Sequence, residues 1–198
     1  MGSVSLYLAK KLLDHVFGGG DFIRPATVYA CLLTVRPTMA DTGSTITEAD
    51  YTGYERKAII NNSTNFPAAT DLSQTPLTSG TLVIGQRYVI DVFNVGDDFT
   101  NVGASSNAEG IEFVASGTTP TAWTEASELL RMGATKSNGV DLEFDECTAG
   151  SSTVGWIAIV DADTAGNVLG IATLQTEKEI TAGDKPRFPA GSINIYKS

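Results

Sequence analysis

The sequence predicts a mainly β protein: a β-sandwich or jelly-roll-like domain with one N-terminal amphipathic helix and an inserted small β module. Three observations lead to this prediction. Short apolar runs rich in β-branched residues recur along the chain, separated by turns that contain Gly, Asn and Asp. One stretch near the N-terminus has helical periodicity. A segment in the middle of the chain has a pattern that differs from its flanks.

The centre of the predicted sheet is a β-hairpin. Residues 156–160 and 168–172 are apolar, and the polar segment 161–167 joins them. Successive side chains of a strand point to opposite faces, and here the residues on both faces are apolar. Such a strand must be covered on both sides. The run 27–35 has the same character, so we expect it to be buried in the same way.

Residues 4–17 have the pattern of an amphipathic helix. Ser3 or Ser5 can cap its N-terminus, and the glycines at 18–20 end it. The apolar stripe consists of Val4, Leu8, Leu12, Leu13, Val16 and Phe17, with Lys10, Lys11 and Asp14 on the other side. We expect the helix to lie across the sheet, because one-sided stripes usually serve the core of their own chain. The alternative is that it docks on a partner protein.

Further short segments complete the predicted strands. Residues 54–60 and 177–180 have strand propensity, and residues 140–145 and 192–196 alternate between apolar and polar side chains. The Asn-Gly pair at 138–139 predicts a turn just before one of them. Polar segments rich in Pro, Thr, Asp, Gly and Ser, such as 36–53, are expected to be loops.

The region from about Leu77 to Met132 has a pattern of its own. Residues 84–92 and 111–116 alternate as strands do, a long polar connection joins them, and residues 126–132 can add a helical turn. We therefore divide the chain into a parent β-domain, residues 1–76 and 133–198, and an inserted β module, residues 77–132. Insertion at a loop leaves the core hydrogen bonds of the parent domain intact.

The composition excludes several classes of function. The 198 residues carry a net charge of −10 without clustered Lys and Arg, so we expect no nucleic-acid partner. No apolar run approaches the roughly 20 residues of a membrane span, and the N-terminus lacks a signal-peptide pattern.

Cys31 and Cys147 are neither close in sequence nor part of a metal spacing, and we expect free thiols. A soluble protein made in a cytoplasm is the expectation.

The sequence offers no convergent set of catalytic groups. His15 is the only histidine, and neither a cysteine cluster nor a Gly-x-Ser-x-Gly motif accompanies it. Glu109, Glu112, Glu125 and Glu128 are candidates for paired glycosidase carboxylates, but scattered surface acids are ordinary in a chain of this charge. We therefore expect no enzymatic activity and name no catalytic residue.

Two acidic turns have some features of metal loops. Asp161, Asp163 and Asn167 are spaced like ligands of a calcium loop, but the twelfth position of that loop lacks the required glutamate. An ordinary hairpin loop is the simpler interpretation. Asp97–Asp98 is likewise predicted to be a turn. No metal and no cofactor are expected.

Three aromatic residues of the module, Trp123, Tyr88 and Phe99, are candidates for a partner or glycan contact. A module of about fifty residues also needs aromatic side chains for its own small core. We favour this second interpretation.

Several segments carry a family resemblance. They are SLYLAKKLLDHVFGG at 5–19, PATVYACLLTVRPT at 25–38, NNSTNFPAA at 61–69, KSNG at 136–139, the hairpin at 155–172 and ITAGDKPRFPAGSINI at 180–195. In this order they resemble a family of short phage virion proteins, which includes tail-fibre and minor structural proteins and relatives similar to capsid decoration (cement) proteins. The segment 77–132 departs from that pattern, and its GQRYVI motif and the run GDDFTNVGASSNAEGIEFVASGTTPTAW resemble a small module of other phage structural proteins.

The resemblance implies a structural role in a bacteriophage virion. We expect a capsid decoration protein that binds and stabilises the head shell, with the major capsid protein or other virion proteins as partners and as a homo-oligomer on the particle. The alternative is a tail-fibre or host-recognition component that binds a surface glycan. Long fibres usually have trimeric repeats or sustained heptads, and neither occurs here, so decoration is the first expectation.

Overall fold

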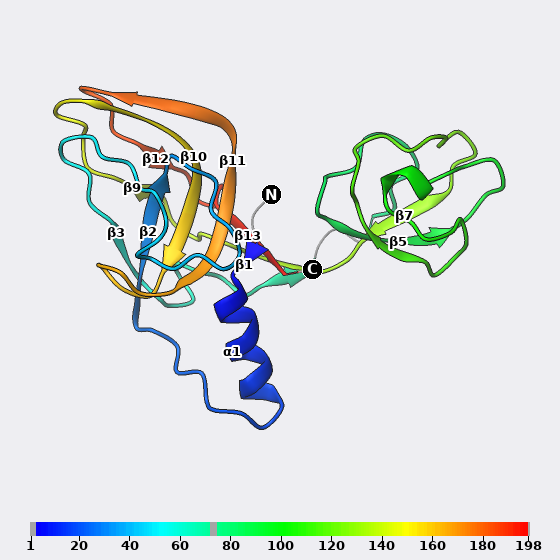
Figure 1. The fold of residues 1–198 in the computed structure, drawn as a ribbon, viewed down its shortest axis with the longest axis horizontal. Coiled ribbons are helices and arrows are strands. Elements are labelled where there is room, and N and C mark those ends of the chain that lie inside the picture. The colour runs from blue at the N-terminus through cyan, green and yellow to red at the C-terminus, as the bar shows by residue number, and fades with distance from the viewer. Residues whose placement is uncertain (1–2, 72–74, 198) are drawn as a thin grey trace. The chain divides into compact units, whose positions relative to one another are not determined.

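The structure, a computed structural model, describes residues 3–71 and 75–197 (Figure 1). Its elements are β1 (Ser3–Val4), α1 (Leu6–Val16), β2 (Thr27–Leu33), β3 (Lys57–Ile60), β4 (Thr70–Asp71), β5 (Arg87–Val92), a 3-10 turn η1 (Thr100–Val102), β6 (Glu112–Val114), β7 (Glu128–Arg131), β8 (Ala134–Ser137), β9 (Leu142–Glu143), β10 (Ser151–Val160), β11 (Val168–Thr181), β12 (Arg187–Phe188) and β13 (Asn194–Lys197). The predicted mainly β fold with one N-terminal helix is confirmed.

The chain forms two compact units. The main unit consists of residues 3–68 and 136–195, and the second unit consists of Ala69–Thr135 with the residues from Tyr196 onward. The module boundaries proposed from the sequence, residues 77 and 132, fall inside the second unit.

The main unit is built on a five-stranded antiparallel sheet in the order β1-β11-β10-β2-β3. The predicted hairpin forms β10 and β11, with Trp156 opposite Thr173 and Ile159 opposite Gly170. Both strands extend beyond the predicted residues, to Ser151 and Thr181. The other apolar run is β2, which pairs with β10 from Tyr29 to Leu33.

Where β2 and β10 pair, both faces of the sheet are buried, as the apolar pattern predicted. On one face, Leu32, Ile157 and Ile159 belong to the large core cluster of the main unit. On the other face, Cys31 and Ala158 belong to a separate buried cluster. Burial raises the pKa of the Cys31 thiol well above its ordinary value, so this side chain remains a neutral packing group.

The large core cluster lies between the sheet and a second layer of short strands. Leu142 of β9, Phe188 of β12 and Ile193 beside β13 pack into it against the residues of β2 and β10. Strands β9 and β12 pair with each other in this layer. The layering of the main unit is therefore sandwich-like.

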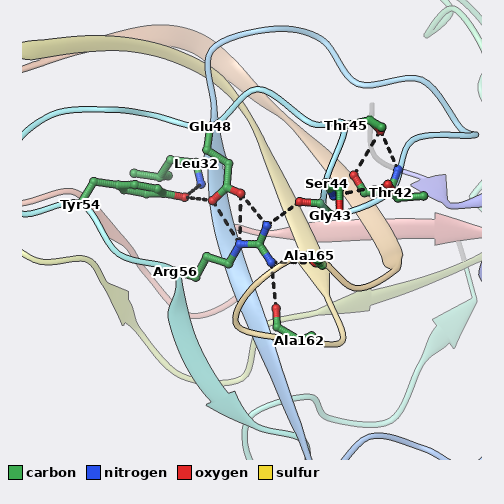
Figure 2. Close-up of polar contacts among 10 residues, drawn as sticks. All are labelled: Leu32, Thr42, Gly43, Ser44, Thr45, Glu48, Tyr54, Arg56, Ala162 and Ala165. Atoms are coloured by element: carbon green, nitrogen blue, oxygen red, sulfur yellow. Dashed lines mark hydrogen bonds and ion pairs between the residues drawn. The ribbon is translucent and has the colours of Figure 1, made fainter.

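Loops cover the other face of the sheet, and one buried arginine holds them (Figure 2). The guanidinium of Arg56 donates from Nε and Nη2 to Glu48 Oε1, at 3.0 and 2.6 Å. Its Nη1 donates to the carbonyl oxygens of Ala162 and Ala165, both at 2.9 Å, and Nη2 donates to that of Gly43 at 2.7 Å. One side chain thus joins the loop that contains Gly43 to the hairpin loop 161–167. We call this arrangement the Arg56 clamp.

The surroundings of the clamp fix its geometry. The Tyr54 hydroxyl donates to Glu48 Oε2 at 2.7 Å and accepts from the backbone N–H of Leu32 at 3.1 Å. Burial raises the pKa of this hydroxyl well above its ordinary value, so it stays a donor. Glycine is required at position 43, because a Cβ there would lie 1.8 Å from the carbonyl oxygen of Ala165.

The second unit contains a three-stranded antiparallel sheet in the order β6-β5-β7. Tyr88, Ile90, Phe99 and Leu129 are among its fully buried side chains. The helical turn expected at residues 126–132 was wrong, because residues 128–131 form β7 and pair with β5. A single isolated helical turn is costly to nucleate, whereas an edge of β5 offers these residues a ladder of backbone hydrogen bonds.

The carboxylate of Asp97 anchors a loop of the second unit. Its Oδ1 accepts from the backbone N–H groups of Thr124 and Glu125 at 2.6 and 2.9 Å, and Oδ2 accepts from that of Ser127 at 2.9 Å. Burial acts to raise the pKa of Asp97, but the hydrogen bonds from Glu125, Ser127 and Thr124 outweigh it and the pKa is lowered. The predicted acidic turn therefore serves as a loop anchor.

We expect Arg56→Ala to lower the free energy of unfolding of the main unit by about 3 kcal/mol, because it leaves the Glu48 carboxylate and three loop carbonyls without their donor. Urea unfolding measures this loss. Arg187→Ala is the matched control, since its ion pair with Asp141 is exposed and screened by water, and only a small loss is expected. Equal losses in the two variants would contradict the clamp.

We expect Asp97→Asn to lower the free energy of unfolding of the second unit by about 2 kcal/mol at neutral pH. The pKa of Asp97 is lower in the folded than in the unfolded state, so its stabilisation is present above the unfolded pKa and is lost as pH falls through the folded pKa. Thermal unfolding from about pH 6 to about pH 2 should therefore show a smaller acid-induced loss for the variant than for the wild type.

Asp98→Asn is the control for this measurement. Asp98 accepts its hydrogen bonds from Thr100 and Asn107 through Oδ1 alone, and an amide oxygen can replace that atom. If Asp98→Asn were the more destabilising of the two variants, the anchoring role of Asp97 would be wrong.

Candidate functional site

The helix α1 lies within the predicted stretch 4–17, and Ser5, one of the two candidate caps, is its N-cap. Val4, which the prediction placed in the apolar stripe, belongs to β1 instead. Ser5 has an extended backbone, and its Oγ accepts a hydrogen bond from the backbone N–H of Leu8 at 3.1 Å. This satisfies one of the N–H groups that a helix leaves without a partner in its first turn. The helix ends at Val16, and Gly18, with a φ of +88°, takes the left-handed backbone that commonly follows a helix.

Only the N-terminal turn of α1 is fixed to the β layers. The backbone N–H of Ser5 donates to Leu169 O at 3.0 Å and that of Leu6 donates to Met39 O at 2.9 Å, while the Ser5 hydroxyl donates to Val168 O. Tyr7 and Leu8 pack against the large core cluster. These contacts hold the start of the helix rigidly.

The rest of α1 exposes its apolar side chains. Leu13 is 59% exposed, Val16 66% and the following Phe17 80%, and none of the residues Leu6–Val16 is fully buried. In Figure 1, α1 extends away from the sheet, and the chain returns from its end to β2. The expectation that the helix lies across the sheet was therefore wrong. The sheet is covered by β9, β12 and the clamped loops instead, and the helix adds only its first turn.

The polar side chains of α1 lie beside the chain's own loops. Lys10, Lys11 and Asp14 line a groove of about 380 Å³, together with Leu6 and Tyr7 of the first helical turn and with Ala40–Thr42 and Asn167–Val168. Thr42 and Asn167 also form a β-bridge to each other, so the groove is bordered by the two loops that the Arg56 clamp joins. The helix thus has polar residues next to its own unit and uncovered apolar residues elsewhere on its surface. Uncovered apolar residues that gather in one place indicate an interaction site.

A second groove of the main unit, about 750 Å³, has an apolar floor that includes Ile157 and Ile180. Three basic residues line the groove, Lys178, Lys185 and Arg187, and two of them have acidic partners: Lys185 Nζ lies 2.6 Å from Glu143 Oε1, and Arg187 pairs with Asp141. These ion pairs lower the pKa of both acids. Two of the three basic charges that line the groove are therefore already paired.

The aromatic candidates of the module do not form a surface platform. Tyr88 and Phe99 are fully buried in the core of the second unit. Trp123 is partly buried, packs edge-to-face on Phe99 at 5.4 Å between ring centroids and donates from Nε1 to Ser127 O at 2.7 Å. The rings thus have the packing role that the sequence favoured, and Tyr88 and Phe99 are not accessible to a ligand.

The polar residues singled out in the sequence have local structural contacts. Asp161 accepts from the backbone N–H and the side-chain amide of Asn167, at 2.6 and 2.8 Å, and so closes the hairpin loop. His15 Nδ1 accepts from the N–H of Phe22 at 3.3 Å. Among the residues described, no three His, Cys, Asp or Glu side chains are grouped to hold a metal. Cys31 and Cys147 are both free, as expected, and both are buried.

No helix in the described part of the chain is long and apolar enough to cross a membrane.

Comparison with known proteins gives one family. The family model of podophage GP4 fibre I protein gp80 matches residues 3–129 and 103–196, and the two matches together run through the segment 77–132. No curated protein matches the chain. The predicted resemblance to phage virion structural proteins is thereby confirmed, because a virion fibre family matches almost the whole chain. The chain belongs to the family of podophage GP4 fibre I protein gp80, a family of phage virion structural proteins.

Proposed function

We propose that this protein is a fibre component of the phage particle and that it acts by contact with other proteins. The observation that carries the proposal is the exposed apolar side of α1, since Leu13, Val16 and Phe17 would be unfavourably hydrated without a partner. The fibre named in the description of the family supports this role over decoration of the head shell.

The proposed role needs no catalysis. The polar groups that the sequence raised as candidates close turns, anchor loops or form surface ion pairs, as the contacts of Asp97, Asp161 and Glu112 illustrate. Cys31, a potential nucleophile, is buried, and its raised pKa keeps it a thiol rather than a thiolate. We therefore propose a structural protein without enzymatic activity.

Assembly on a particle suits a protein whose single contacts are weak. The exposed part of α1 is only a few turns long, so one contact buries less surface than a stable protein interface usually does. Neighbouring sites on a virion raise the effective concentration of each contact, and the assembly as a whole can then be strong.

The number and position of copies in purified virions test the proposal. Quantitative mass spectrometry should find far fewer copies than of the major capsid protein, and gold-labelled antibody should bind at the tail. The major capsid protein in the same digest is the internal standard. Copies in near-equal number to the capsid subunit, with label over the head, would show decoration instead. Absence from mature particles would overturn both structural roles.

A further inference from the structure

Strand β3 is the last strand of the five-stranded sheet, and its side away from β2 has unused backbone groups (Figure 1). The N–H of Asn61 donates to Ala26 O, which sets the alternation of hydrogen bonds between β2 and β3. In an antiparallel pair, every second residue turns its N–H and C=O away from the neighbouring strand. Here these residues are Ala58 and Ile60. In the described part of the chain, no hydrogen-bond partner is found for the N–H and C=O of Ala58 or for the N–H of Ile60.

The C=O of Ile60 marks the end of this open edge. It accepts from the N–H of Asn62 at 3.0 Å and from the side-chain amide of Asn65 at 2.8 Å. An incoming strand would therefore pair with β3 mainly at Ala58, whose side chain is also exposed. An edge of this kind is a template for a strand of another chain.

Strand β9 has a second open edge beside the same groove. The N–H of Phe144 donates to Pro186 O, so the neighbouring Glu143 turns its N–H and C=O away from β12. A groove of about 420 Å³ is lined by β3 and by residues 140–143, among others, and we call it the β3 groove. Ile60 and Val140 line it and are 64% and 38% exposed. The β3 groove thus combines unused backbone groups with exposed apolar side chains.

The charges of the β3 groove favour a basic partner. Three acids line it, Asp141, Glu143 and Asp145, against two bases, Lys57 and Lys185. The ion pairs of the two lysines, at 3.9 Å to Asp145 and 2.6 Å to Glu143, are about half-exposed, so the carboxylates can accept further donors. The whole chain carries a net charge of −10, so a second copy is repelled and a basic segment is attracted.

We propose that an extended, basic segment of another virion protein adds to β3 as a further strand and lies in the β3 groove, an inference that rests on the proposed function. Its backbone exchanges hydrogen bonds with Ala58, and its apolar side chains contact Ile60 and Val140. Because successive side chains of a strand point to opposite sides, the segment alternates apolar residues with Lys or Arg.

Nuclear magnetic resonance of the full chain tests the docking. The probe is a synthetic peptide of about seven residues, the length of a short strand, that alternates valine with lysine. We expect the amide signals of Ala58, Ile60 and Glu143 to shift on titration. The same peptide with N-methylated backbone amides is the control ligand, because it keeps the side chains but cannot donate to Ala58 O. Equal binding of the two peptides would contradict strand addition.

Ala58→Pro removes the backbone donor in the middle of the open edge. This N–H points away from β2, so the β2–β3 hydrogen bonds stay intact, and proline is tolerated at such an edge. The dissociation constant of the valine–lysine peptide should rise about tenfold or more. Ala58→Thr, the matched control, keeps the N–H and favours a strand, so it should leave the affinity unchanged. Far-UV circular dichroism checks the fold of both variants, and equal affinities would overturn the proposal.

Two further measurements test the nature of the partner. A peptide in which glutamate replaces lysine should bind about tenfold more weakly or worse, and equal binding would refute a basic partner. Sedimentation equilibrium examines a second copy as the occupant. Dimers of the wild-type chain that Ala58→Pro abolishes would show that the edge pairs with itself, and would overturn the proposal.

The outcomes separate this inference from the proposed function. A chain that is present in virions but does not bind the valine–lysine peptide would overturn the docking and leave the fibre role intact. Peptide binding that is lost in Ala58→Pro, in a protein absent from mature particles, would support the docking and refute the fibre role.

Discussion

The structure of the main unit depends on a sheet that is apolar on both faces. Strands β2 and β10 pair in its middle, and their side chains enter the large core cluster on one face and a second buried cluster on the other. A sheet of this kind is unstable until both faces are removed from water. The rest of the main unit supplies the two covers, a layer of short strands on one face and loops on the other.

Loops are weak covers, because they have no regular ladder of hydrogen bonds. The Arg56 clamp compensates for this, since the guanidinium binds Glu48 and three loop carbonyls and brings the loop at Gly43 against the hairpin loop. The side chain of Arg56 is only 8% exposed, so removal of one partner would strand a buried charge. The same loops border α1 and so connect the buried sheet to the exposed helix.

The helix is used differently from most amphipathic helices of small domains. Both covers of the sheet are complete without it, so its apolar residues beyond Leu8 have no place in the core. A virion structural protein has other chains around it, and an apolar stripe that is unfavourable in the isolated chain becomes a contact in the assembly. The family match and the exposed helix therefore agree with each other physically.

Much of the fold could be predicted from local pattern. The β10–β11 hairpin, the two-sided burial of β2 and β10, a serine cap at position 3 or 5 and a helix end at the glycines 18–20 follow from periodicity, turn residues and capping chemistry. Residues 126–132 were misassigned as a helical turn, because a run of seven residues is too short for its periodicity to distinguish helix from strand. Pairing with β5 makes residues 128–131 a strand. The packing role of Tyr88, Phe99 and Trp123 was favoured from the size of the module.

The sequence by itself determined which strands are buried, where the helix begins and ends and which side of it is apolar, because these properties depend on residues close together in the chain. Only the tertiary structure decided that this apolar side remains uncovered, and that the guanidinium of Arg56 donates to the carbonyl oxygens of Ala162 and Ala165. Both outcomes depend on contacts between segments that are far apart in the chain. Contacts across more than about a hundred residues leave no periodic pattern in the local sequence.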